Sequence, residues 1–452
     1  MTHGRVDRGW GSGRDPGRGP SRRTLLGAAA ASAGVAVGGA LAGGSRARAA
    51  ANERVRVCVI GVRGRGLGLA RSFAAQPDAV VTHVCDVNEN VFAGAIEAVR
   101  GASPGGPADG PRPVQDLRRV LDDKGVDAIV VATPDHWHAL ATIWGCEAGK
   151  HVYVEKPVSN GIFEGRQMVL AARRHDRLVQ VGTQSRSAPH YHEAMEFLRS
   201  GGIGRVQMAK AWNSQLRRRV PAKPDAAVPA GLDWDIWQGP APERPYNDNR
   251  YTYGWRWLWD YGTGDMGNDG VHDLDIARWG LGVDHPERVV CTGGKLQFTD
   301  DIQETPDTQV VTFTFPEHRM LVYEQRLWSP YHQEGFENGV AFYGNAGFVL
   351  IGRRGWKAVG RGNEVILDKR VEFSDVPHVR NFLDAIRAGT PLACDIEEGY
   401  RSTLLAHLGN LSYRVDRPLR FDAATQSIVD DAEASGLTRR PGRKSFVIPD
   451  LG

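Results

Sequence analysis

Two groups of residues in this chain have the types and spacing needed to hold an oxygen and to move a proton. The first is Glu155-Lys156-Pro157, which follows the short apolar run 152–154. That run predicts a buried parallel strand, and ligands in open α/β sheets bind beyond the carboxyl ends of such strands. A lysine there can donate to a substrate hydroxyl, and desolvation can move its pKa toward that task. Alone, the tripeptide also fits a surface ion pair at a strand end.

The second group is the glycine-rich stretch 262–275, which contains Asn268, Asp269, His272 and Asp275 and runs into a predicted helix at 276–280. His272 and Asp275 are one helical turn apart, so the carboxylate is predicted to orient the imidazole. A histidine near its free pKa of roughly 6.5 can accept and return a proton. The alternative is a structural histidine that caps the helix.

A third pattern predicts a nucleotide site near the start of the folded chain. The β-branched run 55–60 predicts a strand, and a helical pattern continues through Phe73. Strand, glycine-rich turn and helix form the context of the dinucleotide fingerprint, in which the pyrophosphate lies at the helix N-terminus. The second glycine of that fingerprint is replaced, so the turn is rearranged or the backbone approach is made one residue later. The predicted nucleotide-binding residues of this turn are Gly61, Arg63, Gly64, Arg65 and Gly66.

Asp86 ends the next predicted strand, 80–85, twenty residues beyond Gly66. A carboxylate there can accept hydrogen bonds from the adenosine ribose and repel a 2′-phosphate, which favours NAD over NADP. The alternative for Asp86 is an ordinary turn residue.

The elements that would position these residues alternate between strand and helix. Such alternation predicts a parallel sheet with right-handed crossovers in a Rossmann dinucleotide-binding domain over 52–184. The predicted elements are a loop at 102–113, helices at 114–121, 139–148 and 163–174, and strands at 126–132 and 178–182.

The stretch 132–138, Ala-Thr-Pro-Asp-His-Trp-His, together with Glu155-Lys156-Pro157, resembles the glucose-fructose oxidoreductase, inositol dehydrogenase and rhizopine-catabolism (Gfo/Idh/MocA) family. The resemblance implies that Lys156 is catalytic and that the Lys156-Pro157 peptide is cis, a form rare among X-Pro bonds. It also implies that the neighbouring strand ends line the cofactor, through Thr133, Pro134, His138, Glu155 and Lys156.

The stretch 262–275 also resembles that family's glycine-rich segment ending in His-Asp-x-Asp, which implies that His272 is the general acid/base. Many relatives carry an aspartate four residues before this histidine, where this chain has Asn268 followed by Asp269. Both are therefore candidates for the second catalytic position.

The second half of the chain, 185–452, predicts an α+β domain. Period-2 patterning with short turns predicts a large, mostly antiparallel open sheet, with one face on helices and one free to pack against a partner subunit of a homo-oligomer. The predicted elements are helices at 190–200 and within 378–410, and strands at 206–212, 288–293, 308–315, 320–325, 340–343 and 348–351.

The irregular stretch 213–259 is crowded with aromatic residues, among them five tryptophans at 234, 237, 255, 257 and 259. Rigid aromatic faces suit the C–H faces of a sugar ring. We predict that most of these rings fill the core beneath a long loop and that one or two contact substrate.

Residues 1–50 have the composition of a twin-arginine signal peptide: Arg22-Arg23, an Ala/Gly-rich run at 27–44, and the small-x-small sequence Ala47-Arg48-Ala49. The run is short and rich in glycine, which disfavours a membrane anchor. We therefore expect export to a periplasmic or extracellular location, without stable membrane insertion after cleavage.

Charge and cysteine content exclude several other classes. Eight arginines and only two acidic residues lie in the first 49 positions, so the formal charge of the remainder is near −3 rather than the +3 of the whole chain. No nucleic-acid partner is therefore implied. The five cysteines form no C-x-x-C pair, and Cys58 and Cys85 lie in predicted core strands, so we expect buried thiols and no metal site.

Together these patterns predict an oxidoreductase that transfers hydride between a tightly bound NAD and a hydroxyl of a sugar, sugar derivative or cyclitol. Two alternatives stay open. One is an NAD-dependent glycosidase that works by transient oxidation and elimination, and the other is a sugar-binding or assembly module without redox turnover.

Overall fold

The computed structural model describes residues 54–103 and 109–452. The predicted signal peptide at 1–50 lies outside the described residues, as do positions 104–108 of the predicted loop. Among the residues that are described, no helix is both long and apolar enough to cross a membrane.

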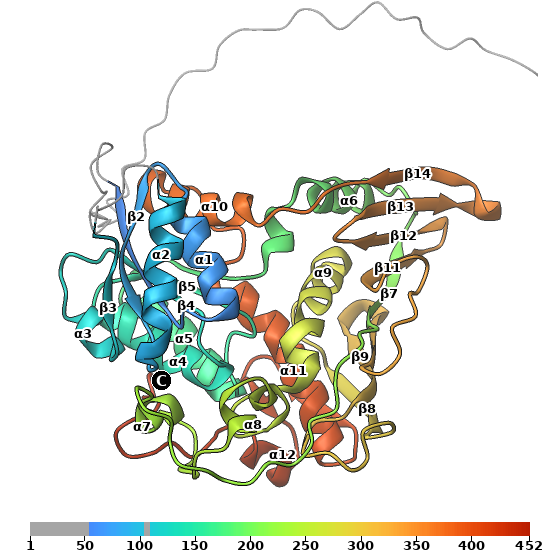
Figure 1. Ribbon diagram of the computed structural model, residues 1–452. Helices are drawn as coiled ribbons and strands as arrows, with labels where there is room; N and C mark the ends of the chain where they lie inside the picture. Colours follow the sequence, from blue (N-terminus) through green and yellow to red (C-terminus); the bar gives the residue numbers. More distant parts are fainter. Residues whose placement is uncertain (1–53, 104–108) are drawn as a thin grey trace, which may run out of the picture. The chain divides into compact units, whose positions relative to one another are not determined.

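The first sheet has six strands in the order β3-β2-β1-β4-β5-β6, and all its paired strands run parallel (Figure 1). This confirms the predicted Rossmann sheet. Its strands are β1 (Val55–Ile60), β2 (Ala79–Cys85), β3 (Arg112–Val114), β4 (Ala128–Val131), β5 (His151–Val154) and β6 (Val179–Val181).

Helices cover both faces of this sheet, which explains why β1 is apolar at nearly every position. Val57 and Val59 pack in one core cluster with Phe73 and Phe382, whereas Cys58 and Ile60 belong to the cluster on the opposite face. The helices of the first cluster are α1 (Gly64–Ala74), α2 (Phe92–Ala102) and α10 (Val376–Ala388), and those of the second are α3 (Leu117–Leu121), α4 (Asp135–Glu147) and α5 (Ile162–Arg174). Helix α10 thus returns from the C-terminal half of the sequence to the first sheet.

The predicted starts of two helices in the first domain are wrong. Val114 belongs to β3, and α3 begins only at Leu117 because the Asp116 side chain caps it by accepting from the backbone N of Arg118. Helix α4 begins at Asp135, directly after Pro134, rather than at Ala139.

The helix predicted at 276–280 is α9 (Val271–Leu281), and a π-helical turn, Met266–Gly270, leads into it. The glycines of this stretch mark close packing rather than a loop. A Cβ on Gly267 would lie 2.0 Å from Thr263 Oγ1, and one on Gly270 would lie 2.1 Å from Tyr323 Oη.

The second sheet has ten strands in the order β14-β13-β12-β11-β7-β10-β9-β8-β15-β16. Within the described chain β7 and β10 are its one parallel pair, so the prediction of a large, mostly antiparallel sheet is confirmed. The strands are β7 (Val206–Asn213), β8 (Arg288–Gly294), β9 (Thr308–Phe315), β10 (Arg319–Arg326), β11 (Asn338–Gly344), β12 (Gly347–Gly352), β13 (Gly355–Gly360), β14 (Val365–Arg370), β15 (Leu419–Asp422) and β16 (Ser427–Ile428).

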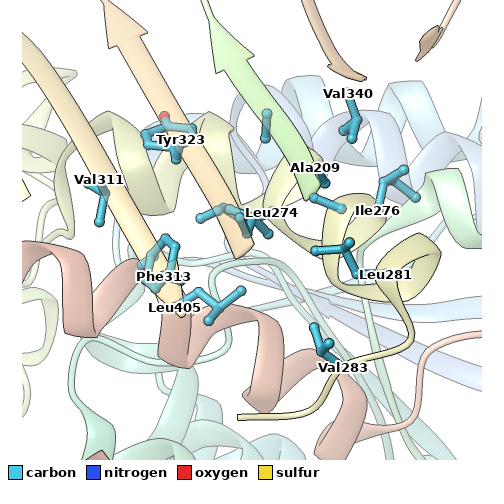
Figure 2. Close-up of a cluster of buried hydrophobic side chains, with 14 of the residues drawn as sticks. Ala209, Leu274, Ile276, Leu281, Val283, Val311, Phe313, Tyr323, Val340 and Leu405 are labelled. Atoms are coloured by element: carbon cyan, nitrogen blue, oxygen red, sulfur yellow. The ribbon is translucent and has the colours of Figure 1, made fainter. Parts of the chain in front are cut away.

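One face of this sheet packs on α6 (Pro189–Arg199), α9 and α11 (Ile396–Arg414). Figure 2 shows Leu274 of α9 lying against the sheet beside Phe313 and Tyr323. Buried and exposed side chains alternate along β9 with the period of a strand. Val311 and Phe313 are buried, whereas Val310 points to the opposite face and is 42% exposed.

The aromatic stretch forms a small core of its own, as predicted for most of its rings. Trp234 and Trp237 of α7 (Trp234–Gln238) stack at 4.5 Å between ring centroids, and Tyr251 of α8 (Asp248–Tyr251) contacts Trp237. All five cysteines are buried and free of disulfides, which confirms their interpretation as small apolar side chains. Within residues 54–103 and 109–452 no cluster of three or more His, Cys, Asp or Glu residues is arranged to hold a metal ion.

Candidate active site

A cavity of about 660 Å³ lies at the carboxyl ends of the first sheet, and residues of the second domain form its opposite wall. It brings Lys156 of the first domain and His272 of the second domain to one space. Gly66 is the one predicted site residue outside its lining, and the predicted residues that do line it are Gly61, Arg63, Gly64, Arg65, Asp86, Thr133, Pro134, His138, Glu155, Lys156, Asn268, Asp269 and His272.

The glycine-rich turn has the geometry that a dinucleotide needs. Gly61 has a φ of +81°, and a Cβ on Gly66 would lie only 1.7 Å from the carbonyl oxygen of Gly61. Gly64 has a φ of +40°, and a Cβ there would meet no atom of the described chain within 4 Å. The backbone at the N-terminus of α1 is therefore open toward the cavity at Gly64, the position predicted to replace the missing second glycine.

Arg63 takes the place of that glycine without closing the turn. Its backbone is extended at the N-cap of α1, and its guanidinium carbon lies 4.9 Å from the ring centroid of Tyr251. The side chain thus extends away from the turn to the loop of the second domain.

Asp86 accepts hydrogen bonds from the glycine-rich turn and from the turn after β2, at the predicted adenosine end of the cavity. Its carboxylate accepts from the backbone N of Val62 at 2.9 Å and from that of Asn88 at 3.0 Å, and burial raises its pKa. A carboxylate accepts about four hydrogen bonds, so capacity remains for ribose hydroxyls. The turn, the open backbone at Gly64 and Asp86 together fit an NAD molecule.

Lys156 follows β5, and its peptide bond to Pro157 is cis, as predicted. The ammonium donates to the backbone oxygen of Asn268 in the second domain. An ammonium has three donors, so this bond leaves two for a ligand.

Glu155 is held by protein partners. Its carboxylate accepts from Arg65 Nε at 2.8 Å and from Gln184 Nε2 at 3.2 Å, and Arg65 also pairs with Asp375 of the segment before α10. Arg65 and Glu155 therefore join the glycine-rich turn to the end of β5 beside Lys156.

His138 ties the ends of two strands together. Its Nδ1 lies 2.7 Å from the carbonyl oxygen of Pro157, and its Nε2 lies 2.9 Å from that of Thr133. Because both ring nitrogens contact backbone, His138 positions the turn that carries Lys156.

His272 is 8% exposed, and its Nδ1 has no hydrogen-bond partner in the described chain. Burial, reinforced by the positive charges of Arg353 and Lys156, lowers its pKa well below 6.5. The expectation that this histidine titrates near its free value is therefore wrong, because the imidazole is buried beside positively charged side chains. The imidazole is neutral, the form that accepts a proton.

The prediction that Asp275 orients His272 is also wrong. Asp275 points into the helix packing, where its carboxylate accepts from Arg186 Nε at 2.8 Å and from Ser402 Oγ at 2.6 Å. One helical turn places two residues on one side of a helix, but here the buried Arg186 pairs with the carboxylate.

Asn268 and Asp269 line the cavity with different partners. The Asn268 amide donates to Asp265 at 2.8 Å and its oxygen accepts from Arg256 Nε at 3.3 Å. Asp269 accepts from Gln215 and, at 2.9 Å, from Asn338 of β11. Asn268 thus connects Lys156 with the aromatic loop, and Asp269 connects the π-helical turn with the second sheet.

Sequence patterns did not single out Arg256 and Arg353, which also line the cavity. Arg256 lies between Trp255 and Trp257 in the aromatic stretch. These neighbouring rings were the one feature of the sequence that could have indicated a role for Arg256 in the site. Arg353 lies at the β12–β13 turn, 78 residues beyond the end of the 262–275 stretch that contains His272. Trp237 and Trp255 line the cavity as well, which makes them the candidates for the one or two rings predicted to contact substrate.

Comparison with known proteins identifies the family. The model described as "Oxidoreductase family, NAD-binding Rossmann fold" matches residues 55–183, and the model of the same family's "C-terminal alpha/beta domain" matches 209–321 and 365–448. The chain belongs to the Gfo/Idh/MocA oxidoreductase family. Its first domain is accordingly the family's NAD-binding domain, and the cavity lies at the nucleotide-binding edge of that domain.

Three relatives illustrate the range of this family. Inositol 2-dehydrogenase of Rubrobacter xylanophilus is 25% identical over 82% of this chain and 94% of its own length. A glycosyl hydrolase family 109 protein of Saccharopolyspora erythraea is 35% identical, but over only 34% of this chain and 38% of its own. The structure of levoglucosan dehydrogenase in complex with NADH and levoglucosan covers 81% of this chain and 99% of its own at a TM-score of 0.63 and 18% identity, a likeness of fold.

Proposed function

We propose that this Gfo/Idh/MocA protein is an NAD-dependent dehydrogenase that oxidises a hydroxyl of a sugar, sugar derivative or cyclitol. The observation that carries the proposal is that Lys156 of the first domain and His272 of the second domain line the same cavity as the glycine-rich turn. Dehydrogenases named for inositol and levoglucosan are among the relatives, which supports the substrate class.

The roles of the protein groups follow from their chemistry. When bound, the nicotinamide supplies a hydride acceptor. Lys156 donates to the reacting hydroxyl with a free N–H and stabilises its oxygen as charge develops there. Neutral His272 accepts the hydroxyl proton through its imidazole. Because the His272 site is buried, bulk water does not compete for that position.

A substrate panel tests this proposal. Purified protein is incubated with hexoses, inositols, 3-keto-glycosides and aryl glycosides while the absorbance of reduced nicotinamide is followed. We expect reduction with at least one polyol. Binding of sugars without any change at the nicotinamide, for protein shown to contain NAD, would instead indicate a binding module.

Tight retention of the nucleotide is part of the proposal. The stretch 230–233 of the second domain packs along the loop after β2, through Glu89 N to Gly231 O and Asp233 N to Val87 O, both at 2.9 Å. Asn88 also donates to Tyr251 Oη at 2.7 Å. These contacts lie beside Asp86 and support slow escape of the adenosine.

Mass spectrometry of denatured, freshly purified protein tests retention. We expect about one nucleotide per chain after gel filtration, and faster loss for Tyr251→Ala than for wild type. Protein that is purified without nucleotide and binds it only weakly would contradict this part of the proposal.

Redox-neutral glycoside cleavage is the second candidate, favoured by the partial match to a family 109 glycosyl hydrolase. In that reaction the same proton transfer would serve elimination, and the sugar would be reduced again. Release of nitrophenol from an aryl glycoside without net accumulation of reduced nicotinamide would favour it over the dehydrogenase.

We further propose a homo-oligomer formed through the face of the second sheet that carries no helices. Val310 and Tyr343 on this sheet are 42% and 41% exposed, which supports an unburied apolar surface. Sedimentation analysis of wild type and Tyr343→Glu tests this, with a shift toward monomer expected for the variant and an unchanged mass contradicting it.

We also propose export by the twin-arginine route, supported by Arg22-Arg23 and the Ala/Gly-rich run that follows. Fractionation of cells that express wild type and a variant with Lys at both positions tests it. We expect the variant to remain in the cytoplasm, and equal export of both would contradict the proposal.

A further inference from the structure

Three guanidinium groups that line the cavity form no ion pair with a carboxylate of the described chain: Arg63 beside the glycine-rich turn, Arg256 and Arg353. Neither Arg256 nor Arg353 forms an ion pair within the parts of the chain that the structure describes, although both line the cavity. Arg65, which lines the same cavity, is by contrast paired with both Glu155 and Asp375. Arg65 thus gains two ion pairs within the protein, whereas Arg256 and Arg353 gain none from the described residues.

Arg256 is fixed among neutral groups. Its guanidinium carbon lies 4.3 Å from the ring centroid of Trp255 and 4.6 Å from that of Tyr253, and NH1 donates to the Tyr253 carbonyl at 3.2 Å. Burial lowers its pKa, and the nearby Tyr253, Asp135 and Asp265 offset only part of that effect. Such a charge costs free energy in the free protein, and an anion from outside would remove that cost.

Arg256 is close to the reacting groups. Its Nε donates to the Asn268 side chain, and the backbone oxygen of the same residue accepts from Lys156. Within the described chain, Nε and one terminal nitrogen of Arg256 donate to protein atoms. A guanidinium has five N–H donors, so some remain for a ligand.

Arg353 also lines the cavity, near His272, and unlike Arg256 it is exposed. Its side chain lies over the ring of Phe373, with the guanidinium carbon 5.2 Å from the centroid, and donates no hydrogen bond to the described residues. Its charge contributes to the low pKa of His272, which shows that the two groups interact across the cavity wall.

The carboxylates near these arginines do not neutralise them. Asp269 and Asp265 are bound to Arg217, and Asp265 also accepts from Asn213 and Asn268. Asp273 is buried beside Arg353, and burial raises its pKa well above the usual range, which favours its neutral form. Asp135 is buried as well, and its pKa is raised in the same way.

We propose that the substrate carries an anionic group, a carboxylate or a phosphate, which Arg256 and Arg353 bind while its hydroxyl lies between Lys156 and His272. Arginine matches both anions through paired N–H donors. The nucleotide pyrophosphate has its own site at Gly64 and the N-terminus of α1, with Arg63 beside it. The inference rests on the proposed dehydrogenase site and names the class of its substrate.

Binding and turnover together test it. Calorimetry on the nucleotide-containing protein compares glucuronate and galacturonate, as sugar acids, with glucose 6-phosphate and with glucose and myo-inositol, and nicotinamide reduction is recorded for the same compounds. We expect one of the anionic classes to bind at least about tenfold more tightly than its neutral counterpart. Preference for the sugar acid or for the phosphate identifies the anion.

Variants locate the effect. Arg256→Gln and Arg353→Gln are expected to weaken binding of the anionic compound by at least about tenfold relative to binding of its neutral counterpart. Arg219→Gln is the matched control, because Arg219 is exposed, pairs with Asp300 and does not line the cavity. Circular dichroism checks that all three variants fold.

Equal binding of neutral and anionic sugars by wild type would overturn the inference. So would an unchanged preference for the anion in both cavity variants. A third contradicting result is that these variants bind nucleotide more weakly but bind the sugar acid as tightly as wild type does. Oxidation of neutral sugars alone would overturn it and leave the proposed dehydrogenase standing. Absence of nicotinamide reduction with every compound, despite selective anion binding, would overturn the dehydrogenase and leave the anion site standing.

Discussion

The two walls of the cavity are built in different ways. The wall of the first domain consists of neighbouring strand ends and of turns directly attached to them, at Gly61–Gly66, Asp86, Thr133 and Lys156. The opposite wall is assembled from an aromatic loop, a π-helical turn and a hairpin tip, represented by Arg256, Asp269 and Arg353. The first wall depends on local backbone geometry, whereas the second depends on contacts between distant segments.

The largest expected effect is at Lys156, where the two walls meet. Lys156→Ala removes the donor to the reacting hydroxyl and the bond to Asn268, so we expect turnover to fall by about 10²- to 10⁴-fold. The nucleotide content is expected to stay near that of wild type, because the glycine-rich turn is unchanged.

Single-turnover reduction of the bound nicotinamide measures this effect. Lys124→Ala serves as the control, since Lys124 is exposed and outside the cavity. Unimpaired reduction by Lys156→Ala would remove Lys156 from the reaction.

The second effect concerns the first wall alone. Gly66→Ala places a Cβ 1.7 Å from the carbonyl oxygen of Gly61, so the turn must move, and we expect bound nucleotide to fall by about tenfold or more. Gly68→Ala on the same helix is the matched control, because a Cβ there meets no atom of the described chain within 4 Å. Nucleotide content is measured by mass spectrometry, and equal content in the two variants would contradict the role assigned to the turn.

These two walls also differ in how far the sequence predicts them. The strand ends around Lys156 and Asp86 follow from apolar runs and a turn motif that lie within a few residues of one another. The partner of Asp275 could not be predicted, because Arg186 is 89 positions away in the sequence. The residue pattern of the helix that contains Asp275 does not indicate that an arginine packs against it. Arg353 was missed for the same reason, since its place beside His272 depends on how ten strands are ordered.

Burial was the other quantity that the sequence did not provide. The expected pKa of His272 was that of free histidine, but the packing of α9 and the charges of Arg353 and Lys156 lower it. Conversely, the cis peptide at Lys156-Pro157, which the family resemblance implied, is present. The backbone at Gly64 is open, which matches one of the two alternatives that the missing second glycine left.

The third effect is a dependence of stability on pH at the contact between the domains. His378 of α10 is fully buried against Ser187 and the Val181 carbonyl, and burial lowers its pKa to about 4. The unfolded chain binds a proton near pH 6.5 and the folded chain does not. The free energy of unfolding therefore falls as pH decreases from about 6.5 to 4, by about 1.4 kcal/mol per pH unit from this residue.

Urea unfolding of wild type and His378→Gln between pH 7 and 4.5 measures that slope. We expect the variant to have a lower free energy of unfolding at pH 7, and that free energy to fall less steeply as the pH decreases. The difference between the two slopes gives the contribution of His378, separate from those of other titrating groups. Parallel curves for the two proteins would contradict the buried, neutral state of this histidine.

The smallest effect is at the adenosine end of the first wall. Asp86→Asn keeps one acceptor for the turn but no longer repels a 2′-phosphate, so we expect the preference for NAD over NADP to decrease by about fivefold. Competition between the two nucleotides for unfolded and refolded, nucleotide-free protein measures it. Asp122→Asn, an exposed change outside the cavity, should leave the ratio unchanged, and an equal ratio in Asp86→Asn would assign Asp86 to the turn alone.

The central claim is that one group from each wall acts on the same substrate hydroxyl. Its most direct test is transfer of deuterium from a sugar or cyclitol labelled at the oxidised carbon to the nicotinamide retained by the protein, read by mass spectrometry in a single turnover. We predict transfer by wild type and its loss in both Lys156→Ala and His272→Ala, with nucleotide still bound. Undiminished transfer in either variant, or labelled product without label on the nicotinamide, would contradict the claim.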